Sequence, residues 1–267
     1  MDAQLATLFA LTFAINLIGT LAYAARIAGV RTRRIALAFS LFNILVLVSR
    51  TANSFQAPLL AKRVEKNVLA GTTAGALTDF RWLLLAASLA TVVGAVLTPT
   101  AQRLFTRAVG GLTRRRSFPR LVLGALSPHG LYALRASVAA PATANIATAA
   151  GRSGAPAGVL LVNAAATAVW TVGVFAALYA AYLAPDLRAT ASNLSAVVNG
   201  VATILLFVLV DPWLAVLTDD VVEGRASEAR FRRSVVGLIG SRFAGTVAAQ
   251  LLLVPAAGLV AAVARHL

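Results

Sequence analysis

The chain has 267 residues, of which 59% are hydrophobic and 12% are charged, and its mean hydropathy is +0.82. This composition excludes a soluble globular protein and is typical of a protein that crosses a membrane several times. The absence of cysteine excludes disulfides and thiolate metal sites. The net charge of +15 comes almost wholly from arginine, which in a membrane protein favours basic loops beside anionic lipid over nucleic-acid binding.

Six apolar segments are long enough to cross a bilayer as α-helices. They cover residues 3–25, 35–60, 81–103, 157–183, 194–217 and 234–263. We therefore predict an all-α polytopic membrane protein, built as a single integral membrane domain over residues 1–267.

The stretch 118–156 does not fit this pattern, because it is only moderately apolar and contains basic residues and four prolines. Irregular backbone at membrane depth is tolerated only where protein or a water-filled cavity satisfies its polar groups. We interpret the stretch as an additional interfacial or re-entrant helical segment. A single crossing here would instead invert the topology of everything that follows.

Lysine and arginine are distributed unevenly between the connections. Most of the 24 basic residues lie in the connections after the first, third and fifth predicted helices, including four arginines between positions 26 and 34. The positive-inside rule then predicts that these connections are cytoplasmic and that both termini lie outside.

Arg50 lies within the second predicted helix. An arginine in hydrocarbon costs from ~2.5 to above ~10 kcal/mol, so it is expected to face a protein interior or a watery cavity. At 100° per residue, Asn43, Asn53 and Gln56 share the face of Arg50. A planar guanidinium among amides suits a phosphate or pyrophosphate. The alternative is an arginine that extends its head group to the membrane surface.

The sixth predicted helix supplies a second polar stripe. Arg242, Thr246 and Gln250 recur at four-residue intervals and so share one face of the helix. Arg242 is expected nearer the cytoplasm than Arg50, so that the two arginines could form successive stations for an anion. The alternative is a structural pair with an acid, for which Asp211 is the candidate.

Two further polar residues enter the prediction. Asp211, near the cytoplasmic end of the fifth helix, could be an ion-coupling site or could balance an arginine, and we favour the ion pair. Arg135, in the stretch 118–156, could join a cytoplasmic anion-binding vestibule. The sequence has no phosphate-binding glycine loop, zinc motif or nucleophile elbow. We therefore expect no catalytic residue, no metal and no cofactor, and not an enzyme.

The fourth predicted helix carries alanines four residues apart, a spacing that allows close helix packing. They are Ala164, Ala168, Ala176, Ala180 and Ala184. The seam could serve a neighbour in the same chain or a second subunit, so a homo-oligomer stays open.

Two long runs resemble one family. The run NLIGTLAYAARIAGVRTRRIALAFSLFNILVLVSRTANSFQAPLL, residues 16–60, and the run TILLFVLVDPWLAVLTDDVVEGRASEARFRR, residues 203–233, are similar to Amj, the alternate lipid II flippase family of bacteria. The resemblance implies a multi-pass cytoplasmic-membrane protein of peptidoglycan and cell-wall biogenesis. It would move lipid II, the undecaprenyl-pyrophosphate-linked precursor, from the inner to the outer leaflet. The implied partners are lipid II and membrane lipids, with no nucleic acid.

The residues and the resemblance together give a hypothesis. The basic loops gather the headgroup, Arg242 and Arg135 receive the pyrophosphate, and Arg50 draws it toward the outer leaflet. Two alternatives remain: a transporter of another lipid-linked or small anion, and a non-transporting membrane scaffold for cell-wall synthesis.

Arg50→Ala is expected to abolish lipid II flipping while the protein remains inserted, because the variant lacks the cation of the outer station. Growth rescue of a bacterium depleted of its flippases measures transport, and membrane fractionation measures insertion. Normal rescue by the variant would remove Arg50 from the mechanism.

Overall fold

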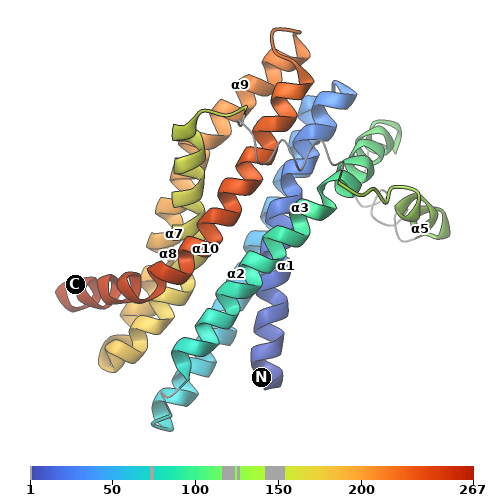
Figure 1. Cartoon of the computed structure of the whole chain (residues 1–267). Helices are drawn as coiled ribbons and strands as arrows, with labels where there is room; N and C mark the ends of the chain where they lie inside the picture. Colours follow the sequence, from blue (N-terminus) through green and yellow to red (C-terminus); the bar gives the residue numbers. More distant parts are fainter. Residues whose placement is uncertain (1, 73–74, 116–123, 125–126, 142–153) are drawn as a thin grey trace.

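The computed structural model describes the chain except for residues 1, 73–74, 116–123, 125–126 and 142–153. Within the described part there is no β-strand, and six helices are long and apolar enough to cross a membrane. The predicted all-α fold with six membrane helices is therefore confirmed (Figure 1).

The bounds of the helices differ from prediction mainly at their ends. They are α1 Ala3–Thr32, α2 Ile35–Leu69, α3 Ala76–Arg115, α5 Pro128–Arg135, α7 Ala157–Leu183, η1 Pro185–Leu187, α8 Arg188–Leu205, η2 Leu206–Val210, α9 Asp211–Val222 and α10 Glu228–His266. The helix α7 has its predicted bounds, and the other membrane helices are longer than predicted. Much of the stretch 118–156, which was predicted as an interfacial or re-entrant segment, lies outside the described residues.

The membrane helices form two halves, α1–α3 and α7–α10. In the first half α1 packs against both α2 and α3, and in the second half α7 packs against both α8 and α10. The helices α3 and α10 provide the largest contact between the halves. Figure 1 shows that α1 and α7 run in opposite directions, so the second half repeats the packing order of the first with inverted direction.

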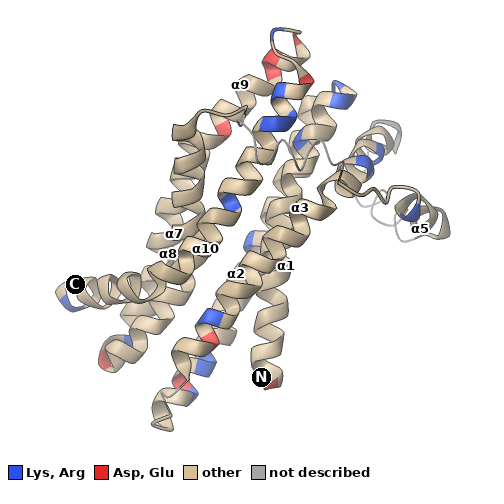
Figure 2. Cartoon of the chain, in the orientation of Figure 1, with Lys and Arg blue, Asp and Glu red and all other residues tan. Residues whose placement is uncertain are grey.

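The molecule has two ends that differ in charge. We call the end that holds the N-terminus, the α2–α3 connection and η1 the terminal end. The opposite end holds the α1–α2 and α9–α10 connections and is the basic end, with Arg33, Arg34 and Arg225 among its residues (Figure 2).

The first half is fastened at the terminal end by Arg63. Its guanidinium lies 2.6 Å from a carboxylate oxygen of Asp2, which caps α1, and 2.7 Å from one of Asp79 on α3. The Leu5 backbone N–H donates to the Asp2 carboxylate, and this bond with the Arg63 contact holds the pKa of Asp2 below its ordinary value. One arginine of α2 thereby links all three helices.

The longer first helix changes the place of Arg26. The helix α1 ends only where Arg33 adopts a left-handed conformation, with φ of 53°. Arg26 is therefore a buried helical residue, and its sequence-based assignment to a cytoplasmic connection was wrong. The extra turns follow from Ile27, Ala28 and Val30, which are buried against other helices and so stabilise helix beyond the predicted end.

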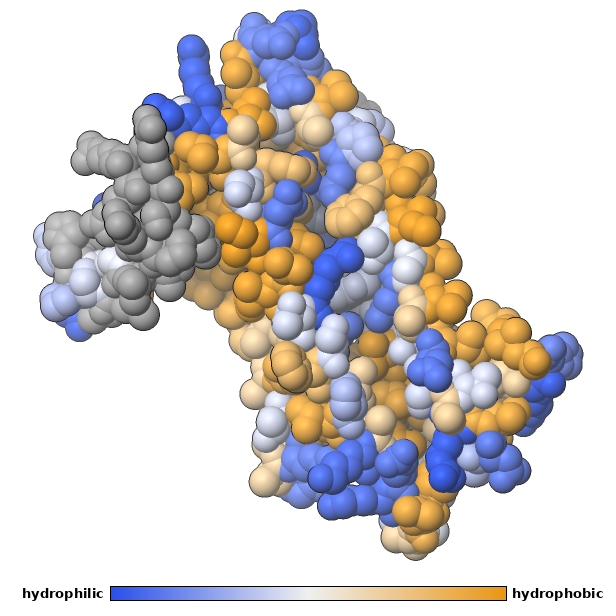
Figure 3. Space-filling view, turned by 180° about the vertical axis from the view of Figure 1, so that it is seen from behind, coloured by the Kyte–Doolittle hydropathy of each residue, from blue (hydrophilic) through white to orange (hydrophobic). Residues whose placement is uncertain are grey.

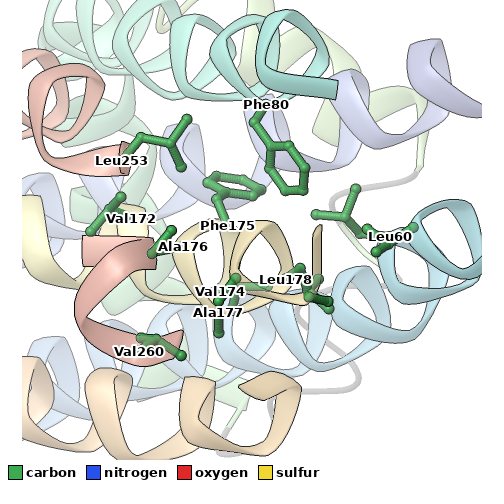
Figure 4. Packing of buried hydrophobic residues seen from close by; sticks show 14 of the residues in the cluster. Leu60, Phe80, Val172, Val174, Phe175, Ala176, Ala177, Leu178, Leu253 and Val260 are labelled. Atoms are coloured by element: carbon green, nitrogen blue, oxygen red, sulfur yellow. The ribbon is translucent and has the colours of Figure 1, made fainter. Parts of the chain in front are cut away.

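The apolar core lies where α2, α3, α7 and α10 meet. The rings of Phe80 and Phe175 pack edge to face at 6.2 Å between centroids, with Leu60 and Leu253 beside them (Figure 4). The alanine seam of α7 packs within the same chain, since α10 crosses it closely at Gly245. A Cβ at Gly245 would lie 2.4 Å from the backbone oxygen of Ala164.

We predict that Gly245→Ala destabilises the protein by about 1–3 kcal/mol, because the added methyl group overpacks the α7–α10 contact. Gly240→Ala on the same helix is the matched control, since a Cβ there meets nothing within 4 Å. Thermal unfolding of both variants in detergent is the measurement. Equal melting temperatures for the two variants would contradict the prediction.

Candidate anion-binding site

Buried polar side chains from three helices meet inside the bundle. In each helix they recur at four-residue intervals, which places them on one face. We call this set the interior polar seam: Thr12, Asn16 and Thr20 on α1, Asn163, Thr167 and Thr171 on α7, and Arg242 and Thr246 on α10. The faces are turned inward because hydrocarbon offers no hydrogen-bond partners.

Arg242 is the one cation of this seam. It is 8% exposed, and its Nη2 lies 3.5 Å from the Asn16 Oδ1. Its guanidinium carbon lies 6.0 Å from the ring centroid of Trp170. Its Nε has no hydrogen-bond partner, and none of the described acids forms an ion pair with it. The charge is therefore buried without a compensating anion.

Gly19 makes the space that Arg242 occupies. A Cβ at position 19 would lie 2.7 Å from the Arg242 Nη2. An unpaired buried charge costs several kcal/mol, so the bundle retains this arginine against a substantial penalty. Two nearby hydroxyl groups, those of Thr167 and Thr171, are also buried without a partner. Together they leave donors inside the membrane that an anion would satisfy.

A small pocket adjoins the seam between α1, α2 and α7. Its polar lining includes Asn16, Asn53, Gln56 and Thr171. Its volume of about 10 Å³ is enough for about one water molecule. The Gln56 amide closes one side by donating to the Thr12 hydroxyl at 2.5 Å. In this conformation the seam is closed, so a larger anion requires the helices around the pocket to separate.

Arg50 lies outside the seam, at the boundary between the two halves. Its Nη2 is 3.4 Å from the Thr203 hydroxyl on α8, and its guanidinium carbon is 5.0 Å from the ring centroid of Phe207. It is half-buried. The face seen in Figure 3 carries hydrophilic surface along a furrow between two apolar flanks. Neither Arg50 nor Arg242 lines the small pocket. Asn53, one turn along α2 from Arg50, and Asn16, the hydrogen-bond partner of Arg242, do line it.

Asp211 pairs with Arg26. The Arg26 Nη2 lies 2.6 Å from the Asp211 Oδ1, and the guanidinium carbon lies 4.4 Å from the ring centroid of Phe42. Arg26 is 6% exposed. Asp211 directly follows the π-helix η2 in the chain, and such π-helical turns are rare and often mark functional sites. Asp211 therefore does not neutralise Arg242, which stays unpaired.

The structure separates several residues that the sequence grouped together. Arg135 is exposed on α5, which lies to the side of the bundle away from α8 and α10 (Figure 1). Asn43 is exposed and lines neither of the two pockets described here. Gln250 donates to the Arg81 backbone oxygen at 3.0 Å, and Thr246 is buried and donates to the Phe243 backbone oxygen.

Sequence reasoning missed the polar faces of α1 and α7. The signal was present as the four-residue spacing of Thr12, Asn16 and Thr20 and of Asn163, Thr167 and Thr171. Such residues are common in membrane helices and carry no charge, so spacing alone did not distinguish them from packing positions. Among the described residues, no three or more His, Cys, Asp or Glu side chains come together as metal ligands.

The fold and the site define a polytopic α-helical membrane protein with an unpaired arginine in its interior. The model of a protein family described as "Amj: Alternate to MurJ" matches residues 11–264, and the chain belongs to this family. It is 35% identical over 268 residues to the lipid II flippase Amj of Bacillus subtilis (strain 168). The aligned region covers 98% of this chain and 97% of that protein. No solved structure matches. The resemblance found in the sequence is confirmed at the level of the family.

We predict that Asp211→Asn destabilises the protein by about 3 kcal/mol, because Arg26 is left buried without its anion. The double variant Arg26→Met/Asp211→Leu is expected to regain stability, since it removes both charges and keeps similar volume. Thermal unfolding of the purified variants reports on both. Wild-type stability of Asp211→Asn would show that the ion pair does not anchor α1 to α9.

Proposed function

We propose that this protein is a lipid II flippase of the bacterial cytoplasmic membrane. Its relative in Bacillus subtilis is named for this activity. The structural observation that supports the proposal is the unpaired, buried guanidinium of Arg242. A pyrophosphate is the dianionic group through which the headgroup joins the lipid tail, and it supplies the missing anion.

The physical problem of the reaction is to move a charged, polar headgroup through hydrocarbon while its tail stays in lipid. The interior polar seam supplies hydroxyl, amide and guanidinium groups that replace water around the headgroup. The boundary between α2 and α8 provides a lateral route that the tail can follow outside the protein. Arg50 lies on that boundary, and Arg242 is buried in the interior of the bundle beside Asn16.

The distribution of arginine supports an orientation. The basic end carries Arg33, Arg34, Arg225, Arg232 and Arg233. We place this end in the cytoplasm and the terminal end outside, by the positive-inside rule. Arg26 and Asp211 then close the cytoplasmic side, and Arg50 lies between this ion pair and the terminal end.

Transport of this kind makes and breaks no covalent bond. The proposed role of the residues is binding and orientation: Arg242 holds the pyrophosphate, with Asn16 and Thr171 beside it. The inverted relation of the two halves supports alternating exposure of one central site to the two sides of the membrane.

We predict that Arg242→Gln reduces lipid II translocation in proteoliposomes at least tenfold, because a neutral amide loses the charge-assisted contacts to the pyrophosphate. Arg265→Gln, an exposed arginine of the same helix that lies outside the basic end, is the matched control and is expected to transport normally. Stability of Arg242→Gln is expected to equal or exceed that of the wild type, because a buried unpaired charge is removed.

The same proteoliposomes decide between substrates. If the proposal holds, lipid II is moved and an undecaprenyl phosphate without headgroup competes weakly. A wild-type protein that moves another polyprenyl-linked anion but not lipid II would overturn the proposed substrate. Unimpaired transport by Arg242→Gln would remove this arginine from the path.

A further inference from the structure

A second pocket lies at the terminal end, away from the Arg242 site. It has a volume of about 210 Å³ and lies open to the surface between α2, α7 and the first turns of α8. Its lining is Ala61, Val64 and Glu65 from α2, Leu178 and Ala181 from α7, and Arg188, Ala189, Ser192 and Asn193 from α8. This volume is about twenty times that of the small pocket beside the interior polar seam, which suits the end of a short peptide.

The pocket carries two opposite charges that form no ion pair with each other. Glu65 and Arg188 come from different helices, both are exposed, and neither forms an ion pair with a described residue. A ligand that bears both an ammonium and a carboxylate group would satisfy the two together.

The α8 side of the pocket favours a carboxylate. The helix begins at Arg188 directly after η1, and the Pro185 carbonyl accepts the Arg188 backbone N–H. The guanidinium of Arg188 and the polar side chains of Ser192 and Asn193, all in the first two turns of α8, line the pocket and can donate hydrogen bonds to a carboxylate. The floor is formed by small and aliphatic side chains, Ala61, Leu178 and Ala181 among them, which suits peptide residues with methyl side chains.

The pocket and Arg50 lie along the same boundary between α2 and α8. Glu65 follows Arg50 by 15 residues on α2, which is about 22 Å along the helix axis. An extended five-residue peptide spans at most ~18 Å, and the sugar that carries it adds to this reach. When the pyrophosphate has moved from Arg242 to Arg50, the outer of the two stations, the headgroup can therefore place its peptide end in the pocket.

We propose that this pocket binds the peptide end of the lipid II headgroup. Arg188 holds its terminal carboxylate, with Ser192 and Asn193 beside it, and Glu65 holds a free amine of the same peptide. The inference rests on the proposed function and assigns a separate part of the substrate to a separate site. It makes the protein selective for lipids whose peptide ends in a free carboxylate.

The test measures binding of the detergent-solubilised full chain to two lipids: lipid II with a free carboxylate, and lipid II with that carboxyl amidated. The wild type is expected to bind the first about tenfold more tightly, the effect of one hydrogen bond to a charged group. Arg188→Gln is expected to lose this preference. Lys66→Gln removes one exposed positive charge at the same end, does not line the pocket, and is expected to keep it.

The outcomes of this binding test distinguish a failure of the peptide site from a failure of the proposed function. Tight binding of both lipids by the wild type with equal affinity would overturn the peptide site and leave the flippase proposal standing. An unchanged preference in Arg188→Gln would also overturn the site. Failure of the wild type to bind or move either lipid would overturn the proposed function, and the peptide site with it.

Discussion

The burial of Arg242 without an acid is the constraint around which the interior is arranged. A guanidinium in this position requires a missing side chain at Gly19 and an amide at Asn16, both on α1, and an aromatic face at Trp170 on α7. These contacts hold the cation but do not neutralise it. The bundle is therefore less stable than an apolar version would be, and in the function proposed above an entering anion meets a partner that is already desolvated and oriented.

Two other arginines in the described membrane helices, Arg26 and Arg50, serve different physical purposes. Arg26 is neutralised by Asp211 and packed against Phe42, so it fastens α1 to the start of α9. Arg50 is only half-buried and has weak partners, the Thr203 hydroxyl and the Phe207 ring. All the partners of Arg26 and Arg50 on the second half lie in or beside the π-helix η2. A change in this short element would therefore alter the contacts that Arg26 and Arg50 make with the second half.

The predicted fold was accurate because bilayer thickness acts on sequence locally. A run of about 20 apolar residues is a membrane helix whatever its neighbours are, and α7 was predicted with its observed bounds. Helix ends were less accurate, since turns beyond the bilayer are stabilised by packing. The error at Arg26 had this cause: four arginines in nine residues resemble a loop, but the residues among them are buried against other helices.

The sequence by itself determined the fold class, the six crossings, the uneven placement of arginine and the polar stripes of α2 and α10. Those features depend on composition and on spacing along one helix. Only the tertiary structure decided that Asp211 pairs with Arg26 and that Arg242 has no described acid beside it. It also brought Glu65 and Arg188 to one pocket across more than a hundred residues of chain. Partner choice depends on how helices cross, and no periodicity within a single helix specifies that crossing.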